Sequence, residues 1–350
     1  MDFAVDDTPT GCTQINESSL PVISPEVMDV IFVNYGVVYP IIIVLGVITN
    51  ILCLIVLCRP RIRDLYVNKY LRFLAVVDLT GIAMCIPTTP LKLTCTFQSY
   101  SKALYYTYFG WMPITVVRNI GLCTVVWMSY DRFIAIWFPH RFTEMKKPSV
   151  IISKQIVTVI LNIVISMPIY ISSKIVCIYT ENEVYWLSEA AYKFNRDDWL
   201  KSYTYFYCIC IAVMQFTLLV FSIGLLLGII KKKIINQSEE NRNMQILQTV
   251  ILLIMNSGYI ASTFAYNFIL LNKYNPEENQ CVATASQESQ MAWVNSIALF
   301  WSAFDISLYL LFIGDYRNVL KSVLLIKKQI STDNAGEINE SSVLSNHPIK

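Results

Sequence analysis

The adjacent charged pair Asp131-Arg132 is the feature of this sequence with the clearest chemistry. Together with Phe133 it closes the third of seven long apolar runs. A charged side chain at the centre of a membrane helix costs about 2.5–3.5 kcal/mol on insertion scales, and less near the ends. The planar guanidinium of Arg132 can bind Asp131, an acid on another helix such as Glu239 or Glu240, or a docking protein. The pair predicts either a switch or an ordinary ion pair that reaches water at the membrane surface.

Two further acids, Asp78 and Asp305, lie inside apolar runs. Carboxylates within a membrane usually face the interior of a helix bundle or a wet cavity. Asn50 and Ser302 could join them in one polar cluster. Because two neighbouring carboxylates rarely both stay ionised without a cation or a proton, a site sensitive to sodium or protons is one interpretation. A static hydrogen-bonded plug that helps the helices to pack is the other.

Arg118 precedes Arg132 by almost four helical turns and so lies on roughly the same helix face. An arginine this deep in an apolar run needs an anionic or carbonyl partner. A ligand could supply it, but backbone carbonyls or a buried carboxylate would serve equally well. Aromatic residues are frequent in the predicted outer half of the spans. Of these, Trp111, Tyr203 and Trp293 are candidates for lining a ligand pocket. For any single aromatic, a place in the interfacial belt is the simpler interpretation.

The elements that must position these residues are membrane helices. Of the 350 residues, 55% are hydrophobic and only 15% are charged, and the mean hydropathy is +0.49. A run of about 20 apolar residues crosses a bilayer, and backbone in lipid must satisfy its own hydrogen bonds, so each run should be a helix. The predicted spans are Ile31–Cys58, Val67–Leu91, Leu104–Trp137, Ser149–Ser172, Trp199–Ile230, Met244–Leu271 and Gln290–Ile313.

The sequence therefore predicts an all-α membrane protein, a seven-transmembrane helix bundle followed by a short amphipathic eighth helix. Its parts are an extracellular N-terminal segment (1–30), the bundle (31–313), the amphipathic helix on the membrane surface (314–328) and a disordered cytoplasmic tail (329–350). No Lys or Arg precedes Arg59, whereas the loops on the other side are rich in both. The positive-inside rule thus places the N-terminus outside the cell and the C-terminus in the cytoplasm.

The cysteines fall into two groups. Six lie in spans, where they serve as small apolar side chains. The other four lie on the predicted outer side, where disulfides persist, and the pairing that we favour is Cys95 with Cys177 and Cys12 with Cys281. Asn16 opens an Asn-Glu-Ser glycosylation sequon on the same side.

Catalysis and nucleic-acid binding have little support. The chain has 2 histidines, His140 and His347, and these form no metal cluster and no Ser/His/Asp set. The basic residues are explained by membrane topology. We therefore expect a protein that is not an enzyme and that holds no metal or cofactor, apart from a sodium ion as an allosteric ligand.

Taken together, these motifs make the chain similar to the rhodopsin-like (class A) G-protein-coupled receptors over nearly its whole length. The matching residues are the following: Gly46 and Asn50 in the first span, Leu74-Ala75-Val76-Val77-Asp78 in the second, Asp131-Arg132-Phe133 in the third, and Asp305 with Tyr309 in the seventh, followed by Tyr316-Arg317. Within that family the chain most resembles invertebrate neuropeptide receptors of the FMRFamide type.

The resemblance implies a receptor of the plasma membrane. An extracellular ligand, either a neuropeptide or a small molecule, would activate a heterotrimeric G protein through Asp131, Arg132, Phe133 and Tyr309, and arrestin and a receptor kinase would be further partners. The chain departs from the family where Thr107 replaces a cysteine and where Ile306 replaces a proline. The sixth span also lacks the Cys-Trp-x-Pro motif of the family and reads Met255-Asn256-Ser257-Gly258 there. Because a missing proline removes a kink, we expect this span to hinge at Gly258 instead. A seven-helix transporter or channel that uses Asp78, Asp305 and Arg118 is the alternative.

Overall fold

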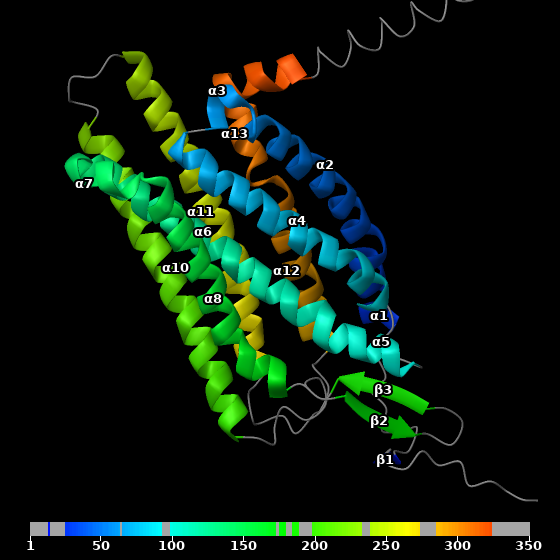
Figure 1. Cartoon of the computed structure of the whole chain (residues 1–350). Coiled ribbons are helices and arrows are strands. Elements are labelled where there is room, and N and C mark those ends of the chain that lie inside the picture. The colour runs from blue at the N-terminus through cyan, green and yellow to red at the C-terminus, as the bar shows by residue number, and fades with distance from the viewer. Residues whose placement is uncertain are drawn as a thin grey trace, which may run out of the picture.

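The computed structural model describes residues 13–14, 25–63, 65–92, 99–172, 175–179, 184–188, 198–232, 239–273 and 285–323. Within them, helices lie side by side in one bundle, as Figure 1 shows. Six of these helices are long and apolar enough to cross a membrane. They are formed by α1 to α2 with a π-helical link (Pro25–Ile31, Phe32–Val38, Tyr39–Leu57), α4 (Tyr66–Lys92), α5 to α6 with a second π-helical link (Tyr100–Leu104, Tyr105–Gly110, Trp111–Trp137), α8 (Pro148–Ser172), α10 (Asp198–Lys232) and α11 (Glu239–Lys273).

The seventh predicted span is present but divided. It consists of α12 (Ala285–Phe304) and α13 (Ser307–Phe312), which are separated by a turn at Asp305 and Ile306. The loss of the proline at 306 therefore does not straighten this span. The backbone N–H of Ile306 donates to Asp305 Oδ1 at 2.6 Å, so the carboxylate replaces the missing helical acceptor. With this span, the fold is the predicted all-α bundle of seven membrane helices.

Short helices and a small sheet mark the two ends of the bundle (Figure 1). One end carries α3 (Pro60–Arg63), α7 (Pro139–Met145) and the C-terminal helix; we call it the Arg132 end. The other, the hairpin end, carries the antiparallel strands β2 (Ile175–Tyr179) and β3 (Val184–Ser188), with β1 (Thr13–Gln14) parallel to β2. The sequence did not predict this small sheet, because its strands of 5 residues are shorter than the strands of a membrane barrel.

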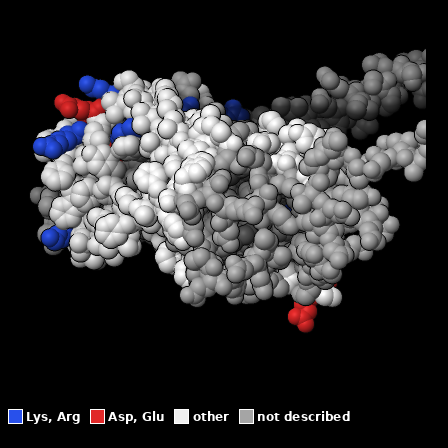
Figure 2. All heavy atoms as spheres, turned by 90° about the horizontal axis from the view of Figure 1, so that it is seen from below, with Lys and Arg blue, Asp and Glu red and all other residues white. Residues whose placement is uncertain are grey.

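The bundle is apolar outside and polar within. Exposed side chains on α8 and α10 are large and hydrophobic, for example Val164 and Phe216, as befits helices that face lipid. Fully buried polar residues such as Asn50, Ser129 and Asn256 instead connect helices to one another. Figure 2, which looks from the hairpin end, shows that the described surface in view is mostly uncharged, with Lys and Arg side chains along one edge and acidic side chains beside them and at the lower edge.

The predicted amphipathic helix is observed at residues 314–323. Tyr316 and Val319 are buried and Leu320 packs against the core, whereas Arg317 and Lys321 are exposed. Apolar positions three and four residues apart thus form one buried face, as in a helix that lies at a membrane surface. Its anchor is the Tyr316 hydroxyl, which donates a hydrogen bond to the side-chain oxygen of Asn68 on α4.

Candidate functional site

Arg132 is 8% exposed and links α6 to α11 at the Arg132 end of the bundle. Its Nε donates to Thr249 Oγ1 at 3.2 Å, and one terminal nitrogen donates to the backbone oxygen of Gln245 at 2.9 Å and to Gln248 Oε1 at 3.1 Å. All three acceptors are uncharged. Arg132 thus contacts the sixth span, but the side chains of Glu239 and Glu240, which were predicted as possible partners, lie outside the described part, so that pairing stays a prediction.

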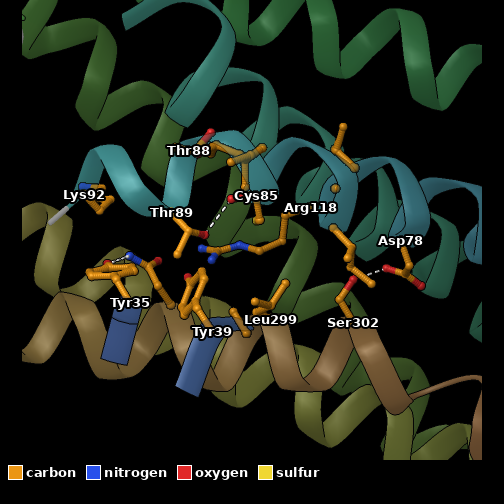
Figure 3. A pocket seen from close by; sticks show the side chains of 17 residues that line it. Tyr35, Tyr39, Asp78, Cys85, Thr88, Thr89, Lys92, Arg118, Leu299 and Ser302 are labelled. Atoms are coloured by element: carbon orange, nitrogen blue, oxygen red, sulfur yellow. Dashed lines mark hydrogen bonds between the residues drawn. The ribbon is translucent and has the colours of Figure 1, made fainter. Parts of the chain in front are cut away.

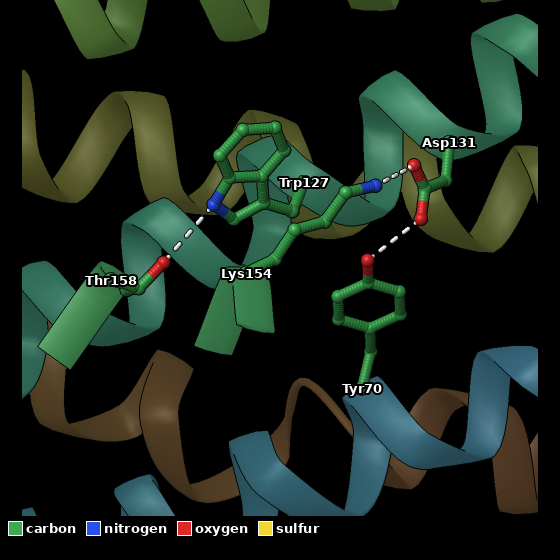
Figure 4. Close-up of polar contacts among 5 residues, drawn as sticks. All are labelled: Tyr70, Trp127, Asp131, Lys154 and Thr158. Carbon is green, nitrogen blue, oxygen red and sulfur yellow. Dashed lines mark hydrogen bonds and ion pairs between the residues drawn. The ribbon is translucent and has the colours of Figure 1, made fainter. Parts of the chain in front are cut away.

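Asp131 does not pair with its neighbour Arg132. Its carboxylate accepts a hydrogen bond from the Tyr70 hydroxyl at 2.7 Å and forms an ion pair with Lys154 Nζ at 2.5 Å, as Figure 4 shows. Lys154 belongs to α8 and lies over the rings of Trp127 and Tyr130, at 5.2 and 5.5 Å from their centroids. Asp131 is fully buried, so it holds α4, α6 and α8 together.

The other two residues predicted for the switch lie on either side of Arg132. Phe133 faces α10, where an added Cβ on Gly224 would meet its ring at 2.6 Å. Tyr309 of α13 is 2% exposed, and its ring lies 6.2 Å from that of Tyr316. Tyr309 and Arg132 both line a small cavity between α4, α6, α11 and α13, so the Arg132 end has internal space for a change in packing.

A larger cavity occupies the half of the bundle nearer the hairpin end (Figure 3). It has about 700 Å³ of space between its lining side chains, part of it open to solvent. Its walls come from the π-helical link and α2, from α4, from α6 and from α12. The polar and aromatic side chains that line it include Tyr35, Tyr39, Asp78, Thr88, Thr89, Lys92, Thr115, Arg118, Asn295 and Ser302.

Arg118 projects into the middle of this cavity (Figure 3). Its guanidinium stacks on the ring of Tyr266 on α11, 4.1 Å from the centroid. Its Nε is buried and has no hydrogen-bond partner within the described chain. Arg118 also forms no ion pair with a described residue, since the carboxylates of Asp78 and Asp305 bind elsewhere. The buried carboxylate that the sequence analysis offered as an alternative partner is therefore not observed.

The predicted polar cluster forms the floor of the cavity. Ser302 donates its hydroxyl hydrogen bond to Asp78 Oδ1, whereas Asp78 Oδ2 is buried and lacks a partner among the described residues. Asn50 donates to the backbone oxygens of Gly46 at 3.0 Å and of Ser302 at 3.4 Å. Asp305 lies one turn further on and accepts from the Tyr259 hydroxyl at 3.0 Å. Asp78 Oδ2 and the Ser302 hydroxyl oxygen are thus of a type that ligates a small cation, whereas the Asp305 carboxylate is already hydrogen-bonded to Tyr259.

The remaining predicted site residues lie apart from the cavity. Trp293 is 48% exposed on α12, and the Tyr203 hydroxyl donates to the backbone oxygen of Ile165 on α8 at 2.6 Å. Neither lines this cavity, because an aromatic residue near the membrane surface need not face inward. Contact of either residue with a ligand stays a prediction. The side chain of Trp111 lies outside the described part.

The structure describes one of the four cysteines predicted to form disulfides, and the predicted glycosylation site lies outside the described residues. Cys177 on β2 is disulfide-bonded, and the six cysteines predicted within the spans are free. Cys12, Cys95 and Cys281 lie outside the described residues, as does Asn16. The pairing itself therefore stays a prediction.

Sequence reasoning missed Tyr35, Tyr39, Lys92, Lys154 and Tyr266 as site residues. Tyr35 lies in the π-helical link and Tyr39 begins α2 directly after it, and the extra residue in the π-helical turn redirects side chains. Asn295 donates to the Tyr35 hydroxyl at 3.1 Å and thereby fixes it against α12. Lys154 could have been found, because it is a lone cation within an apolar run. No sequence signal distinguishes Tyr266 from the other aromatic residues.

The bundle of seven membrane helices has a cavity toward one end, and at the other end a buried arginine, Arg132, joins α6 to α11. This architecture is that of the seven-transmembrane receptors. Residues 49–309, more than half of the chain, match the 7 transmembrane receptor (rhodopsin family), so the chain belongs to that family. It is also similar to the human KiSS-1 receptor, with 27% identity over 149 residues. That match covers 39% of this chain and 33% of the KiSS-1 receptor, so it spans about a third of the relative's length.

Proposed function

We propose that this receptor binds an extracellular ligand in the cavity around Arg118 and activates a heterotrimeric G protein at the Arg132 end. The observation that carries this proposal is that one helix, α6, presents Arg118 to the cavity and Arg132 to α11. The proposed topology puts the hairpin end outside the cell, because the basic residues of α3 and α7 then lie in the cytoplasm.

Release of Arg132 is the proposed switch. Its acceptors on α11 are a hydroxyl, an amide oxygen and a backbone oxygen, so no opposing charge among the described side chains holds it. Hydrogen bonds from a charged donor to such groups contribute roughly 1.5–3 kcal/mol each at most, and a docking protein can replace them. Asp131 is bound to Lys154 and Tyr70, so it does not pair with the guanidinium of Arg132 after that group is released.

The ligand that we propose is a neuropeptide. The sequence resemblance to FMRFamide-type receptors supports this choice, and so does the likeness to a receptor for KiSS-1. A cavity that is partly open to solvent and lined by tyrosine, threonine and cationic side chains can take the end of a peptide while the rest lies against the hairpin end. Arrestin and a receptor kinase are the further proposed partners at the cytoplasmic side.

Replacing Arg132 tests the coupling. Arg132→Ala should abolish agonist-independent and peptide-stimulated G-protein dissociation, while antibody staining of intact cells shows an unchanged amount of receptor. Arg141→Ala, which removes an exposed arginine from α7, is the matched control and should signal normally. Full signalling by Arg132→Ala would sink the proposed mechanism.

The floor of the cavity is the proposed place for a sodium ion, held by Asp78 and Ser302. If a cation binds there and stabilises one state of the bundle, Asp78→Asn should remove the sodium dependence of agonist affinity. The measurement is competition binding in sodium and in choline chloride, with the exposed Asp29→Asn as the control. Identical affinities of the unaltered receptor in the two salts would rule the ion site out.

The alternative of a transporter or channel gains no support. A relay through Asp78, Arg118 and Asp305 requires these side chains to contact one another in sequence. Within the described chain, Arg118 instead stacks on Tyr266, and Asp305 accepts from Tyr259.

A further inference from the structure

The cavity has an ordered distribution of charge along its length. The carboxylate of Asp78 lies at its floor, the guanidinium of Arg118 at its middle, and the ammonium of Lys92 toward the hairpin end, as Figure 3 shows. Lys92 lies over the rings of Tyr35 and Tyr106, at 5.9 and 5.3 Å from their centroids. Among the residues that line the cavity, a ligand that enters from the hairpin end therefore meets two cationic groups before it reaches the carboxylate of Asp78.

Arg118 is held in a way that leaves its edge available. Tyr266 covers one face of the guanidinium, which fixes its plane by a cation–π contact. Stacking uses the face of the group, whereas its N–H donors point outward in the plane. Arg118 Nε has no hydrogen-bond partner among the described residues. Buried N–H groups are ordinarily hydrogen-bonded, so this N–H can donate to a ligand in the cavity. Carboxylates match this fork with two parallel hydrogen bonds.

We infer that the ligand's innermost group is a carboxylate, which binds the edge of Arg118 while Tyr39 and Leu299 contact the adjoining apolar part. This inference rests on the proposed function, because it assumes that the cavity is the ligand site. It further names the class of ligand: a peptide with a free C-terminal carboxylate or an acidic side chain at its buried end. An amidated peptide of the FMRFamide kind would therefore have to present an acidic side chain to Arg118, because its terminal amide supplies no counter-charge.

The test uses a library of synthetic tri- to pentapeptides, each made both as the C-terminal acid and as the C-terminal amide. A second arm exchanges Asp for Asn within the amidated peptides, which separates a side-chain carboxylate from a terminal one. Thermal stabilisation of the full-length receptor in lipid nanodiscs measures binding, and G-protein dissociation in cells is recorded separately. The best acid should bind at least about tenfold more tightly than its amide, since a charged hydrogen bond contributes that much.

The variants identify the residue responsible. Arg118→Gln should reduce the ratio of acid to amide affinity to about 1, and Arg118→Lys should keep part of the preference for the acid. Arg72→Gln is the control: Arg72 lies on α4 at the end away from the cavity, so this change should leave the ratio unaltered. If Arg118→Gln fails to fold, Arg118→Lys and the unaltered receptor still decide the matter. The inference is overturned if the unaltered receptor binds C-terminal acids and amides equally and also binds the Asp and Asn peptides equally, or if its preference for the carboxylate survives Arg118→Gln. Acid-selective binding without any G-protein dissociation would instead support this site and count against the proposed function.

Discussion

Asp131 and Arg132 are neighbours in the chain, yet they bind different helices. Successive helical residues point about 100° apart, so Asp131 faces α4 and α8 while Arg132 faces α11. The two side chains therefore do not form an ion pair with each other. The acid connects α6 to α4 and α8, and the arginine connects α6 to α11, the helix that we propose moves on activation.

The Asp131–Lys154 ion pair yields a prediction about stability. Lys154 is 11% exposed and Asp131 is not exposed at all, so Lys154→Gln leaves a buried carboxylate without its cation. Loss of one partner of such a pair costs about 3–5 kcal/mol, which should lower the thermal midpoint of the purified receptor clearly.

A double-mutant cycle separates this pairing from general damage. Asp131→Asn combined with Lys154→Gln should be more stable than Lys154→Gln alone, because the uncompensated charge is gone. Lys147→Gln, which alters an exposed lysine beside α8, should leave the midpoint unchanged. Additive losses in the double variant would show that the two side chains do not interact.

At the scale of elements, α11 and α12 interlock at Gly258. An added Cβ at this position would lie 1.9 Å from Trp301 Cε2, so the absence of a side chain is what admits the indole. The sequence analysis expected a hinge at Gly258, but α11 runs through this residue without a break. Whether the helix bends there during activation stays a prediction.

Gly258→Ala should therefore destabilise the receptor, although alanine is the better helix former. Overpacking of this kind costs about 1–3 kcal/mol, more than the gain in helix propensity of about 1 kcal/mol. Gly36→Ala is the matched control, because the nearest atom to its added Cβ lies at 3.4 Å. Thermal unfolding in detergent is the measurement, and Trp301→Leu should rescue the alanine variant. An unchanged midpoint for Gly258→Ala would contradict the close packing.

The sequence predicted the helical spans well, because an apolar run of bilayer length leaves the backbone little choice but a helix. Their observed bounds differ from the predicted ones mainly at the ends, as with Ile31–Cys58 against the longer Pro25–Leu57 stretch. What it could not predict was helix rotation. The contacts of Lys154 with Asp131 and of Arg118 with Tyr266 depend on which faces of neighbouring helices pack together. The periodicity of apolar residues in a single sequence does not give these faces.

At the scale of the whole molecule, the proposed topology makes the two ends chemically different. Arg59, Lys146 and Lys147 lie on helices or turns at the Arg132 end, and no Lys or Arg precedes Arg59. We expect an epitope tag before residue 1 to be stained by antibody on intact cells, and a tag after residue 350 to be stained only after permeabilisation. Staining of both tags under the same condition would refute the topology.

The two arginines of α6 act on the same neighbour, since Arg118 rests on Tyr266 and Arg132 is bonded to Thr249, both of α11. An anion at the edge of Arg118 binds a group that contacts α11 through Tyr266, and a transducer that captures Arg132 breaks the hydrogen bonds of Arg132 to the same helix. Thermodynamic linkage between two such sites is reciprocal. Occupancy at either end of this helix pair should hence alter the dissociation constant at the opposite end by one shared factor.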